Sequence, residues 1–222
     1  MTDRERVRDA YDEIAGTYDE QRDDDPPETA LLDSVVDRLP DDPRVLDAGC
    51  GSGEPITRRL ATRATVTGVD FSRSQLDLAT DRLPGTAFVQ GDLTALPFRT
   101  DAFDGLVSAY AVIHVPWEEH ATVFEEFRRV LRPAAPLLVS VGSDDWEGST
   151  DDWLGGGAEM HWSQPGPDRT AALLREAGFA VERTAAVADT LADDEAESNV
   201  DDDDDEDDQD DVGEKVFVWA TA

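Results

Sequence analysis

The chain has 222 residues, of which 52 are aspartate or glutamate and only 19 are lysine or arginine, so its formal net charge is −33. A surface this acidic repels nucleic acid and anionic membranes, and we predict neither as a partner. It also repels itself unless salt screens it, which favours a protein from a high-salt cytoplasm over an acidic protein that docks on basic partners.

Cys50 is the only cysteine, and the first six residues contain no apolar stretch. A single cysteine excludes an internal disulfide and a multi-cysteine metal site. The three histidines are scattered along the chain and form no chelating set, so we predict no bound metal. No apolar leader and no run of membrane-spanning length are visible, and we expect the protein in the cytoplasm.

The predicted elements begin with two helices and continue as strands that alternate with helices. Apolar residues at helical spacing predict a helix over 3–15, a loop follows over 16–27, and a second helix covers 28–39. The alternation after residue 43 indicates an α/β fold with a doubly wound, mainly parallel sheet. The predicted strands are 44–48, 65–70, 87–90, 103–109 and 136–142, and the predicted helices are 54–63, 73–83, 118–131 and 169–177.

The end of the chain has a different composition. Extended segments over 179–190 and 215–221 predict a terminal antiparallel pair of strands, and the acidic stretch 192–214 between them has too much like charge to fold. We therefore predict a single domain over 1–222. Its parts are N-terminal helices that form a lid (1–40), a cofactor-binding core (41–142), an acceptor-site loop (143–168) and a disordered acidic insertion (192–214).

A glycine-rich turn follows the first predicted strand. Gly49, Gly51 and Gly53 remove side chains from this turn, so that its backbone can touch a ligand. Asp70 ends the next predicted strand, where its carboxylate can accept hydrogen bonds from both hydroxyls of a ribose. This unit of strand, turn and helix predicts a site for a nucleoside-bearing cofactor.

Several stretches over about residues 43–142 make the pattern more specific. They are VLDAGCGSG, VTGVDFS, FVQGDLTALPF, DAFDGLVSAYAVIHV and EEFRRVLRP. In their order and spacing, the chain resembles the class I S-adenosylmethionine-dependent methyltransferases, especially the small-molecule branch that includes quinone-biosynthesis enzymes. The resemblance implies a Rossmann-like, seven-stranded sheet whose last strand is antiparallel, S-adenosylmethionine as cofactor and S-adenosylhomocysteine as product.

The resemblance also implies which residues bind the methionine part of the cofactor. Asp47 and the turn with Gly49, Gly51 and Gly53 would face its amino group, carboxylate and sulfonium. Ala109 would offer its carbonyl oxygen to the amino group. These positions fall at the carboxyl ends of predicted strands, where open α/β sheets bind ligands.

The nucleoside part is assigned in the same way. Asp70 would bind the ribose hydroxyls, and Phe71 would lie against the adenine ring. Asp92 would accept a hydrogen bond from the adenine amino group, while the backbone amide of Leu93 donates to a ring nitrogen. For each carboxylate, the alternative is a helix cap or a solvated side chain.

An NAD-dependent dehydrogenase shares the glycine turn and the ribose carboxylate. The dinucleotide fingerprint places its third glycine one residue later, where this chain has Glu54, whose charge would oppose a pyrophosphate. The only lysine, Lys215, lies in the final predicted strand, which excludes a tyrosine-lysine dyad. A non-catalytic cofactor-binding or scaffold protein is the other alternative.

His114 is the candidate general base, because the loop after the fourth strand faces the transferred methyl group in the family. Such a base is needed only if the acceptor holds a proton at neutral pH, and a histidine that packs or bonds to the backbone is the alternative. His161 lies in a segment that resembles one after the fifth strand of many small-molecule members. His120 is expected on an exposed helix face and has no assigned role.

The acceptor is predicted to be a small molecule. Aromatic side chains from the N-terminal helix and from the region after the fifth strand can form a roof over the site, which would suit an apolar or planar acceptor. The alternative is that these rings cover a small core of their own. The candidate substrate residues are Tyr11, Tyr18, Trp117, Trp146, His161 and Trp162.

Overall fold

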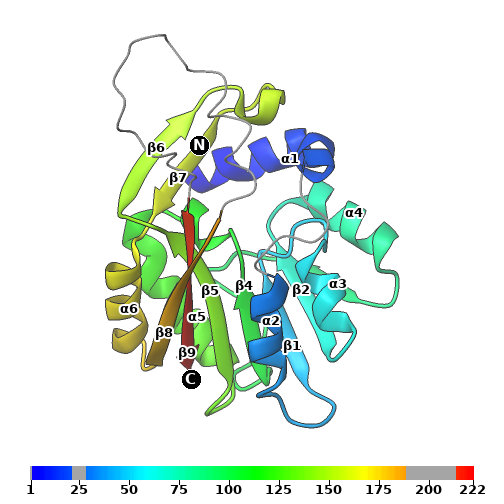
Figure 1. The fold of residues 1–222 in the computed structure, drawn as a ribbon. Helices are drawn as coiled ribbons and strands as arrows, with labels where there is room; N and C mark the ends of the chain where they lie inside the picture. The colour runs from blue at the N-terminus through cyan, green and yellow to red at the C-terminus, as the bar shows by residue number, and fades with distance from the viewer. Residues whose placement is uncertain (1, 22–28, 189–213) are drawn as a thin grey trace.

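The computed structural model describes residues 2–21, 29–188 and 214–222 (Figure 1). The expected loop residues 22–27 and nearly all of the predicted acidic insertion lie outside the described residues. Glu214, the last residue assigned to that insertion, instead begins the final strand.

Seven strands form one sheet in the order β3-β2-β1-β4-β5-β9-β8. The strands β1 to β5 are parallel to one another, and β9 is antiparallel to both β5 and β8. The predicted α/β fold with an antiparallel last strand is therefore confirmed. The strands are β1 Arg44–Ala48, β2 Thr65–Asp70, β3 Ala87–Gln90, β4 Gly105–Ser108, β5 Pro136–Gly142, β8 Ala180–Ala188 and β9 Glu214–Thr221.

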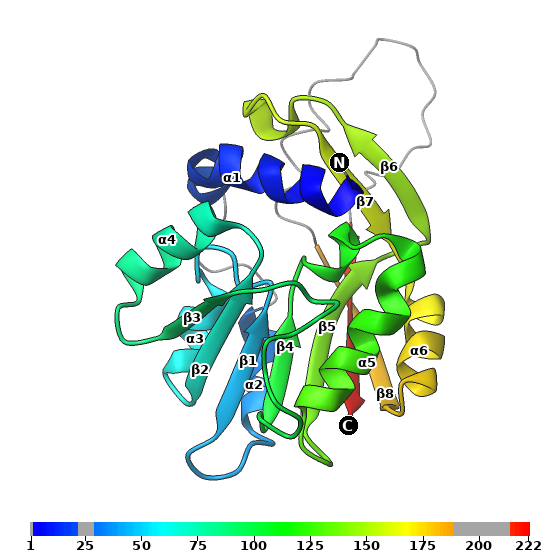
Figure 2. The ribbon, with the colours of Figure 1, turned by 180° about the vertical axis from the view of Figure 1, so that it is seen from behind.

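Helices cover both faces of the sheet (Figures 1 and 2). Successive side chains of a strand point to opposite faces, so Val45 packs in the apolar cluster with α2 and α3, whereas Leu46 packs in the cluster with α5 and α6. This two-sided burial explains why the central strands are apolar throughout. The helices are α2 Thr29–Val36, α3 Ile56–Ala61, α4 Arg73–Arg82, which borders β2 and β3, α5 His120–Val130 and α6 Pro167–Glu176.

Helix α1 (Asp3–Gln21) lies across the carboxyl ends of the strands, beside a hairpin of β6 (Trp146–Thr150) and β7 (Met160–Gln164) (Figures 1 and 2). A separate apolar cluster joins the two elements. Its buried members are Val7, Ala10, Ile14, Tyr18, Trp153, Ala158 and Met160.

The first helix is longer than predicted. It continues through Gly16 to Gln21 because Tyr18 is buried on the same face as Ile14, one turn earlier. Gly16 is exposed and lies within the helix, and a Cβ added there would meet nothing within 4 Å. The predicted loop from residue 16 was wrong for these residues.

Two further expectations were wrong. The region 143–168 contains the β6–β7 hairpin and a short 3-10 turn, Trp153–Gly155, rather than only a loop. His120 is fully buried, not exposed: it begins α5, and its Nε2 atom bonds to the carbonyl oxygen of Val115 at 2.7 Å.

Candidate functional site

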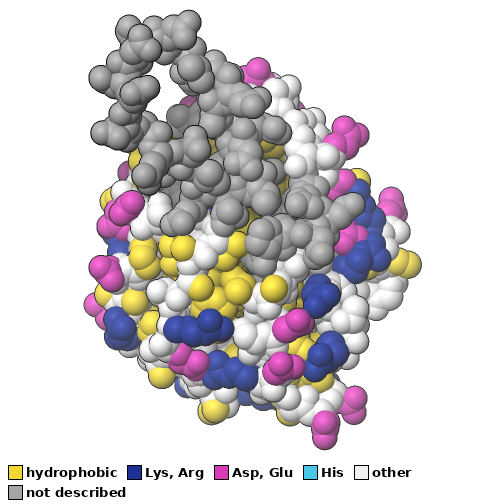
Figure 3. Space-filling model, viewed as in Figure 1, with side chains coloured by type: hydrophobic (Ala, Val, Ile, Leu, Met, Phe, Trp, Pro, Cys, Tyr) yellow, Lys and Arg dark blue, Asp and Glu magenta, His cyan; other side chains and the backbone are white. Residues whose placement is uncertain are grey.

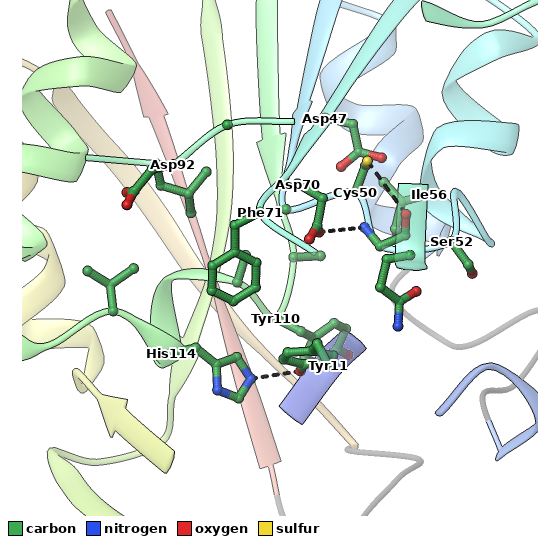
Figure 4. A pocket seen from close by; sticks show the side chains of 18 of the residues that line it. Tyr11, Asp47, Cys50, Ser52, Ile56, Asp70, Phe71, Asp92, Tyr110 and His114 are labelled. Carbon is green, nitrogen blue, oxygen red and sulfur yellow. Dashed lines mark hydrogen bonds between the residues drawn. The ribbon is translucent and has the colours of Figure 1, made fainter. Parts of the chain in front are cut away.

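An open cleft of about 890 Å³ lies at the carboxyl ends of β1 to β4, beneath α1 (Figure 4). The chain passes from β1 to β2 on one side and returns to β4 on the other, so the strand order reverses between β1 and β4. Such a reversal leaves a crevice between the loops, and open α/β sheets bind ligands there.

The glycine turn forms the floor of this cleft. The backbone amides of Gly49 and Cys50 donate to the carbonyl oxygen of Val69 at 2.7 and 3.0 Å, which fixes the turn to β2. Gly49 has a φ of 82°, and a Cβ there would lie 2.1 Å from the Cβ of Ala111. No other residue fits this position without moving the loop after β4.

Asp70 is the central carboxylate of the site. Its Oδ2 accepts from the backbone amide of Gly51 and its Oδ1 from that of Ser72, both at 2.9 Å. Burial raises the pKa of this carboxyl to about 6, although these backbone hydrogen bonds favour the ionised form. At neutral pH the residue is therefore a carboxylate, with lone pairs left for a ligand.

Asp47, in β1, and Cys50, in the glycine turn, are buried side chains of the cleft lining. The Asp47 carboxylate is buried and accepts from the hydroxyl of Thr57 at 2.5 Å. Burial, together with the charges of Asp70 and Asp47, raises the pKa of the Cys50 thiol well above its usual value. Cys50 is thus a protonated, space-filling side chain at neutral pH and not a nucleophile.

Asp92, on the loop after β3, is bound by the first turn of α1. Its Oδ2 accepts from Nη1 of Arg4 at 2.5 Å, and its Oδ1 accepts from the backbone amide of Thr94 at 2.8 Å. The Nε atom of Arg4 also lies 2.9 Å from a carboxylate oxygen of Glu119. Arg4 therefore ties α1 both to the loop after β3 and to the short turn that precedes α5.

His114 and Tyr11 form a hydrogen-bonded pair that faces the cleft (Figure 4). His114 Nδ1 is 2.9 Å from the carbonyl oxygen of His161, which can only accept, so Nδ1 bears the proton. Burial lowers the pKa of His114 to about 4, and the ring is neutral at pH 7. Its Nε2 therefore accepts from the Tyr11 hydroxyl, 2.9 Å away.

The structure gathers most of the residues that were assigned to the cofactor. Asp47, Gly49, Gly51, Asp70, Phe71, Asp92, Leu93 and Ala109 all line the cleft. Gly53 does not: it has a φ of 82°, and a Cβ there would lie 3.0 Å from Leu83 and 3.6 Å from Phe88. Its place in the turn is explained by conformation and by packing against α4 and β3.

Of the six candidate substrate residues, two line the cleft and four do not. Tyr11 and Tyr18 line the cleft together with His114. The ring of Trp162 packs against that of His114 with centroids 5.8 Å apart, and Trp146 is 46% exposed at the edge of the hairpin.

Trp117 and His161 also lie outside the cleft lining. The Arg169 guanidinium lies over the ring of Trp117, and the ring of His161 approaches Glu159.

Several lining residues were missed from the sequence. Arg4, Gln75 and Tyr110 reach the cleft from α1, α4 and the loop after β4. Tyr110 has a φ of 58°, a backbone conformation that is uncommon for tyrosine, and its amide donates to Ser140 Oγ at 2.5 Å. Gln75 has the spacing of a capping box with Ser72 and Tyr110 lies in one of the stretches that carry the resemblance, but neither pattern predicts that these side chains reach the cleft, because that depends on how distant elements pack.

The lining suits a nucleoside joined to a cationic group. A bare turn lets the ligand approach the backbone, Asp70 can accept from vicinal hydroxyls, and Phe71 offers an aromatic face. The buried Asp47 carboxylate contributes negative charge to the cleft lining, which favours a sulfonium or ammonium group over a pyrophosphate. Among the described residues, no group of histidine, cysteine, aspartate and glutamate side chains could hold a metal ion.

Comparisons with known proteins agree with this geometry. Residues 45–134 match the family model of the methyltransferase domain. Methyltransferase GfsG of Streptomyces halstedii is 37% identical over 106 residues, which are 44% of this chain and 37% of that protein. Malonyl-(acyl-carrier protein) O-methyltransferase of Erwinia pyrifoliae is 36% identical over 144 residues, 64% of this chain and 50% of that protein. The chain thus spans half or less of these relatives' length.

Solved structures resemble the whole chain. The crystal structure of the (4+2)-cyclase SpnF superposes with a TM-score of 0.70 at 20% identity and covers 100% of this chain and 97% of the other. At this identity the likeness concerns the fold, which evidently accommodates more than one reaction. No helix in the described part of the chain is both long enough and apolar enough to span a membrane.

Proposed function

We propose that this chain, as a member of the class I S-adenosylmethionine-dependent methyltransferases, transfers a methyl group to a small-molecule acceptor. The observation that carries the proposal is a bare glycine turn beside Asp70 in one cleft, within the residues that match the methyltransferase domain. S-adenosylmethionine is the cofactor and S-adenosylhomocysteine the product.

The residues of the cleft divide the cofactor between them. Asp70 would bind the ribose hydroxyls and Phe71 the adenine ring, while Asp47 and the turn face the amino acid part. Bound S-adenosylmethionine supplies an electrophilic methyl group on a positively charged sulfur. What the protein adds is alignment of the acceptor and exclusion of water, to which the position of α1 over the cleft contributes.

Tyr11 and His114 provide a route for a proton. Tyr11 and His114 both line the cleft and are hydrogen-bonded to each other, so a proton lost by the acceptor can pass to Tyr11 as Tyr11 passes its own to His114. The hydrogen bond from His114 Nδ1 to His161 holds the ring in the required tautomer. We assign this pair as the general base for acceptors that are protonated at neutral pH.

The walls of the cleft suggest the class of acceptor. Tyr11, Tyr18, Phe71, Tyr110 and Val115 give it aromatic and apolar surface next to the His114 ring. An apolar or planar molecule with one hydroxyl or acidic carbon would fit between these side chains. The similarity to other methyltransferases supports methyl transfer without naming the acceptor.

A thermal-shift experiment in high salt tests the cofactor assignment. S-adenosylhomocysteine at about 100 times its dissociation constant should stabilise the wild-type protein by about 2.7 kcal/mol. Asp70→Ala should abolish the shift, because the ribose loses its acceptor. Asp77→Ala is the control. It should leave the thermal shift unchanged, because the Asp77 side chain is exposed on α4.

The outcomes separate the alternatives. Stabilisation by NADH without stabilisation by S-adenosylhomocysteine would identify an oxidoreductase instead. Binding of S-adenosylhomocysteine without methylation of any phenol, enol or thiol in an acceptor panel would favour a non-catalytic binding protein. A full shift in Asp70→Ala would refute the ribose assignment.

A further inference from the structure

Gln75 is a buried polar side chain that the site so far leaves unexplained. It is 1% exposed, and neither its Nε2 nor its Oε1 has a hydrogen-bond partner among the described residues. It also lines the cleft. Buried amides are almost always hydrogen-bonded, because an unpaired one loses its interactions with water and gains nothing in return.

The local structure explains why this amide is left free. Ser72 is the N-cap of α4, and its hydroxyl accepts from the backbone amide of Gln75 at 3.2 Å. In a complete capping box the Gln75 side chain would bond back to the amide of Ser72. Here Asp70 Oδ1 occupies that amide, at 2.9 Å, so the Gln75 side chain has no capping role.

The side chain lies at the Asp70 end of the cleft. Its Oε1 is 3.6 Å from the point that a Cβ of Gly51 would occupy, and the amide of Gly51 donates to Asp70 Oδ2. A side-chain amide both donates and accepts, which matches a hydroxyl group, whereas a carboxylate only accepts. Gln75 and Asp70 together therefore present complementary partners for a diol.

We propose that Gln75 is a second ribose-binding residue, whose amide bonds a hydroxyl of the nucleoside that Asp70 also binds. The inference rests on the proposed function, because it takes the ligand to be S-adenosylmethionine. It adds a polar contact to the cofactor site at a position whose sequence pattern predicts only a helix cap.

Calorimetric titration of Gln75→Met tests the proposal. Methionine has a similar length and removes only the amide, so the ligand-free variant should melt no lower than the wild type, while its affinity for S-adenosylhomocysteine falls about five- to tenfold. The affinity for 5′-methylthioadenosine, which keeps the ribose and lacks the amino acid part, should fall by the same factor.

Thr170→Val is the matched control. Thr170 is fully buried in α6, its hydroxyl has no partner among the described residues, and it does not line the cleft. This variant should also melt no lower than the wild type, but its affinities for both ligands should be unchanged. It separates loss of a buried polar atom from loss of a ligand contact.

Three results would overturn the proposal. One is an unchanged affinity of Gln75→Met for both ligands, and another is a loss confined to S-adenosylhomocysteine, which would assign Gln75 to the amino acid part. The third is a lower melting temperature of ligand-free Gln75→Met, which would show a structural role. Failure of the wild-type protein to bind either ligand would instead refute the proposed function.

Discussion

Asp70 and His114 are buried next to the same cleft, and burial shifts their pKa values in opposite directions. The pKa of Asp70 rises to about 6 and that of His114 falls to about 4, since a low-dielectric environment disfavours the charged form of each. At neutral pH the site therefore combines an ionised acceptor for hydroxyl groups with a neutral imidazole.

The pKa of Asp70 predicts how cofactor binding depends on pH. In the proposed complex, the ionised carboxylate above about pH 6 would accept from the ribose hydroxyls, whereas protonation below that value would remove an acceptor. The affinity for S-adenosylhomocysteine should therefore weaken as the pH falls through about 6. Calorimetric titrations at a series of pH values measure this, and Asp70→Asn should bind weakly at every pH. An affinity of wild type that is independent of pH would contradict the assignment.

The raised pKa of Asp70 also makes the stability of the ligand-free protein depend on pH, in the direction opposite to that of the ligand affinity. A carboxyl whose folded-state pKa is raised favours folding in its protonated form, and this contribution is lost as the pH rises from the ordinary value of 3.8 to about 6. Above pH 6 the affinity for S-adenosylhomocysteine should therefore be higher, while the free energy of unfolding of the ligand-free protein should be lower.

Tyr11→Phe tests the proton route. For an acceptor that is protonated at neutral pH, kcat should fall about a hundredfold, because the relay to His114 is cut. The affinity for S-adenosylhomocysteine should change little, since the ring remains. His114→Ala should show a similar loss. Full kcat in both variants, measured with the same acceptor, would remove the pair from the mechanism.

Residues in the site differ in how far the sequence predicts them. The glycine turn and Asp70 are local features, since each follows directly on a strand, and the structure places them together. Gln75 and Arg4 act at the cleft only because α4 and α1 pack where they do. Their positions depend on contacts across the fold, which no short motif encodes.

At the level of elements, the strands were the easier part. The bounds of β2 and β5 agree with the prediction, and most of their residues are buried: β5 is buried throughout, and only Thr65 of β2 is exposed. The β6–β7 hairpin was missed because β6, Trp146–Thr150, is mostly exposed and lacks a regular alternation. The strand conformation of β6 depends on its pairing with β7, and β7 is in turn held by the apolar cluster under α1.

The attachment of α1 can be tested with a matched pair of core substitutions. Val7 lies in the α1–hairpin cluster and Val35 in the cluster between α2 and the sheet, and both are nearly inaccessible. Val→Ala at either position should lower the free energy of unfolding by roughly 1–3 kcal/mol. Val7→Ala should in addition accelerate hydrogen exchange selectively in α1 and the hairpin.

Val35→Ala should not produce that selective pattern. Hydrogen exchange followed by mass spectrometry distinguishes the two variants. If Val7→Ala accelerated exchange equally in β1 and α1, the helix would be an integral part of the sheet domain and not a separately attached cover.

For the whole molecule, the net charge of −33 dominates. On the face shown in Figure 3, acidic side chains lie among arginines over the described residues. Pairs such as Arg59 with Asp33 and Arg63 with Asp37 are exposed, and such pairs contribute little. The excess carboxylates repel one another, and we infer a protein that works in high salt.

Thermal unfolding at increasing KCl tests this inference. The melting temperature should rise steeply up to about 1 M KCl, where the Debye length is about 3 Å, and change less above that. Neutral sugar at equal osmolarity is the control for effects other than screening. A melting temperature that is constant or falls with KCl would show that self-repulsion does not limit stability.

The central claim is that the cleft over β1 to β4 binds S-adenosylmethionine. A crystal structure of the protein with S-adenosylhomocysteine tests it most directly. The account predicts density in the cleft, with the ribose hydroxyls on Asp70 and the adenine ring beside Phe71. Density for the compound elsewhere, or a cleft closed by the protein's own side chains, would contradict it.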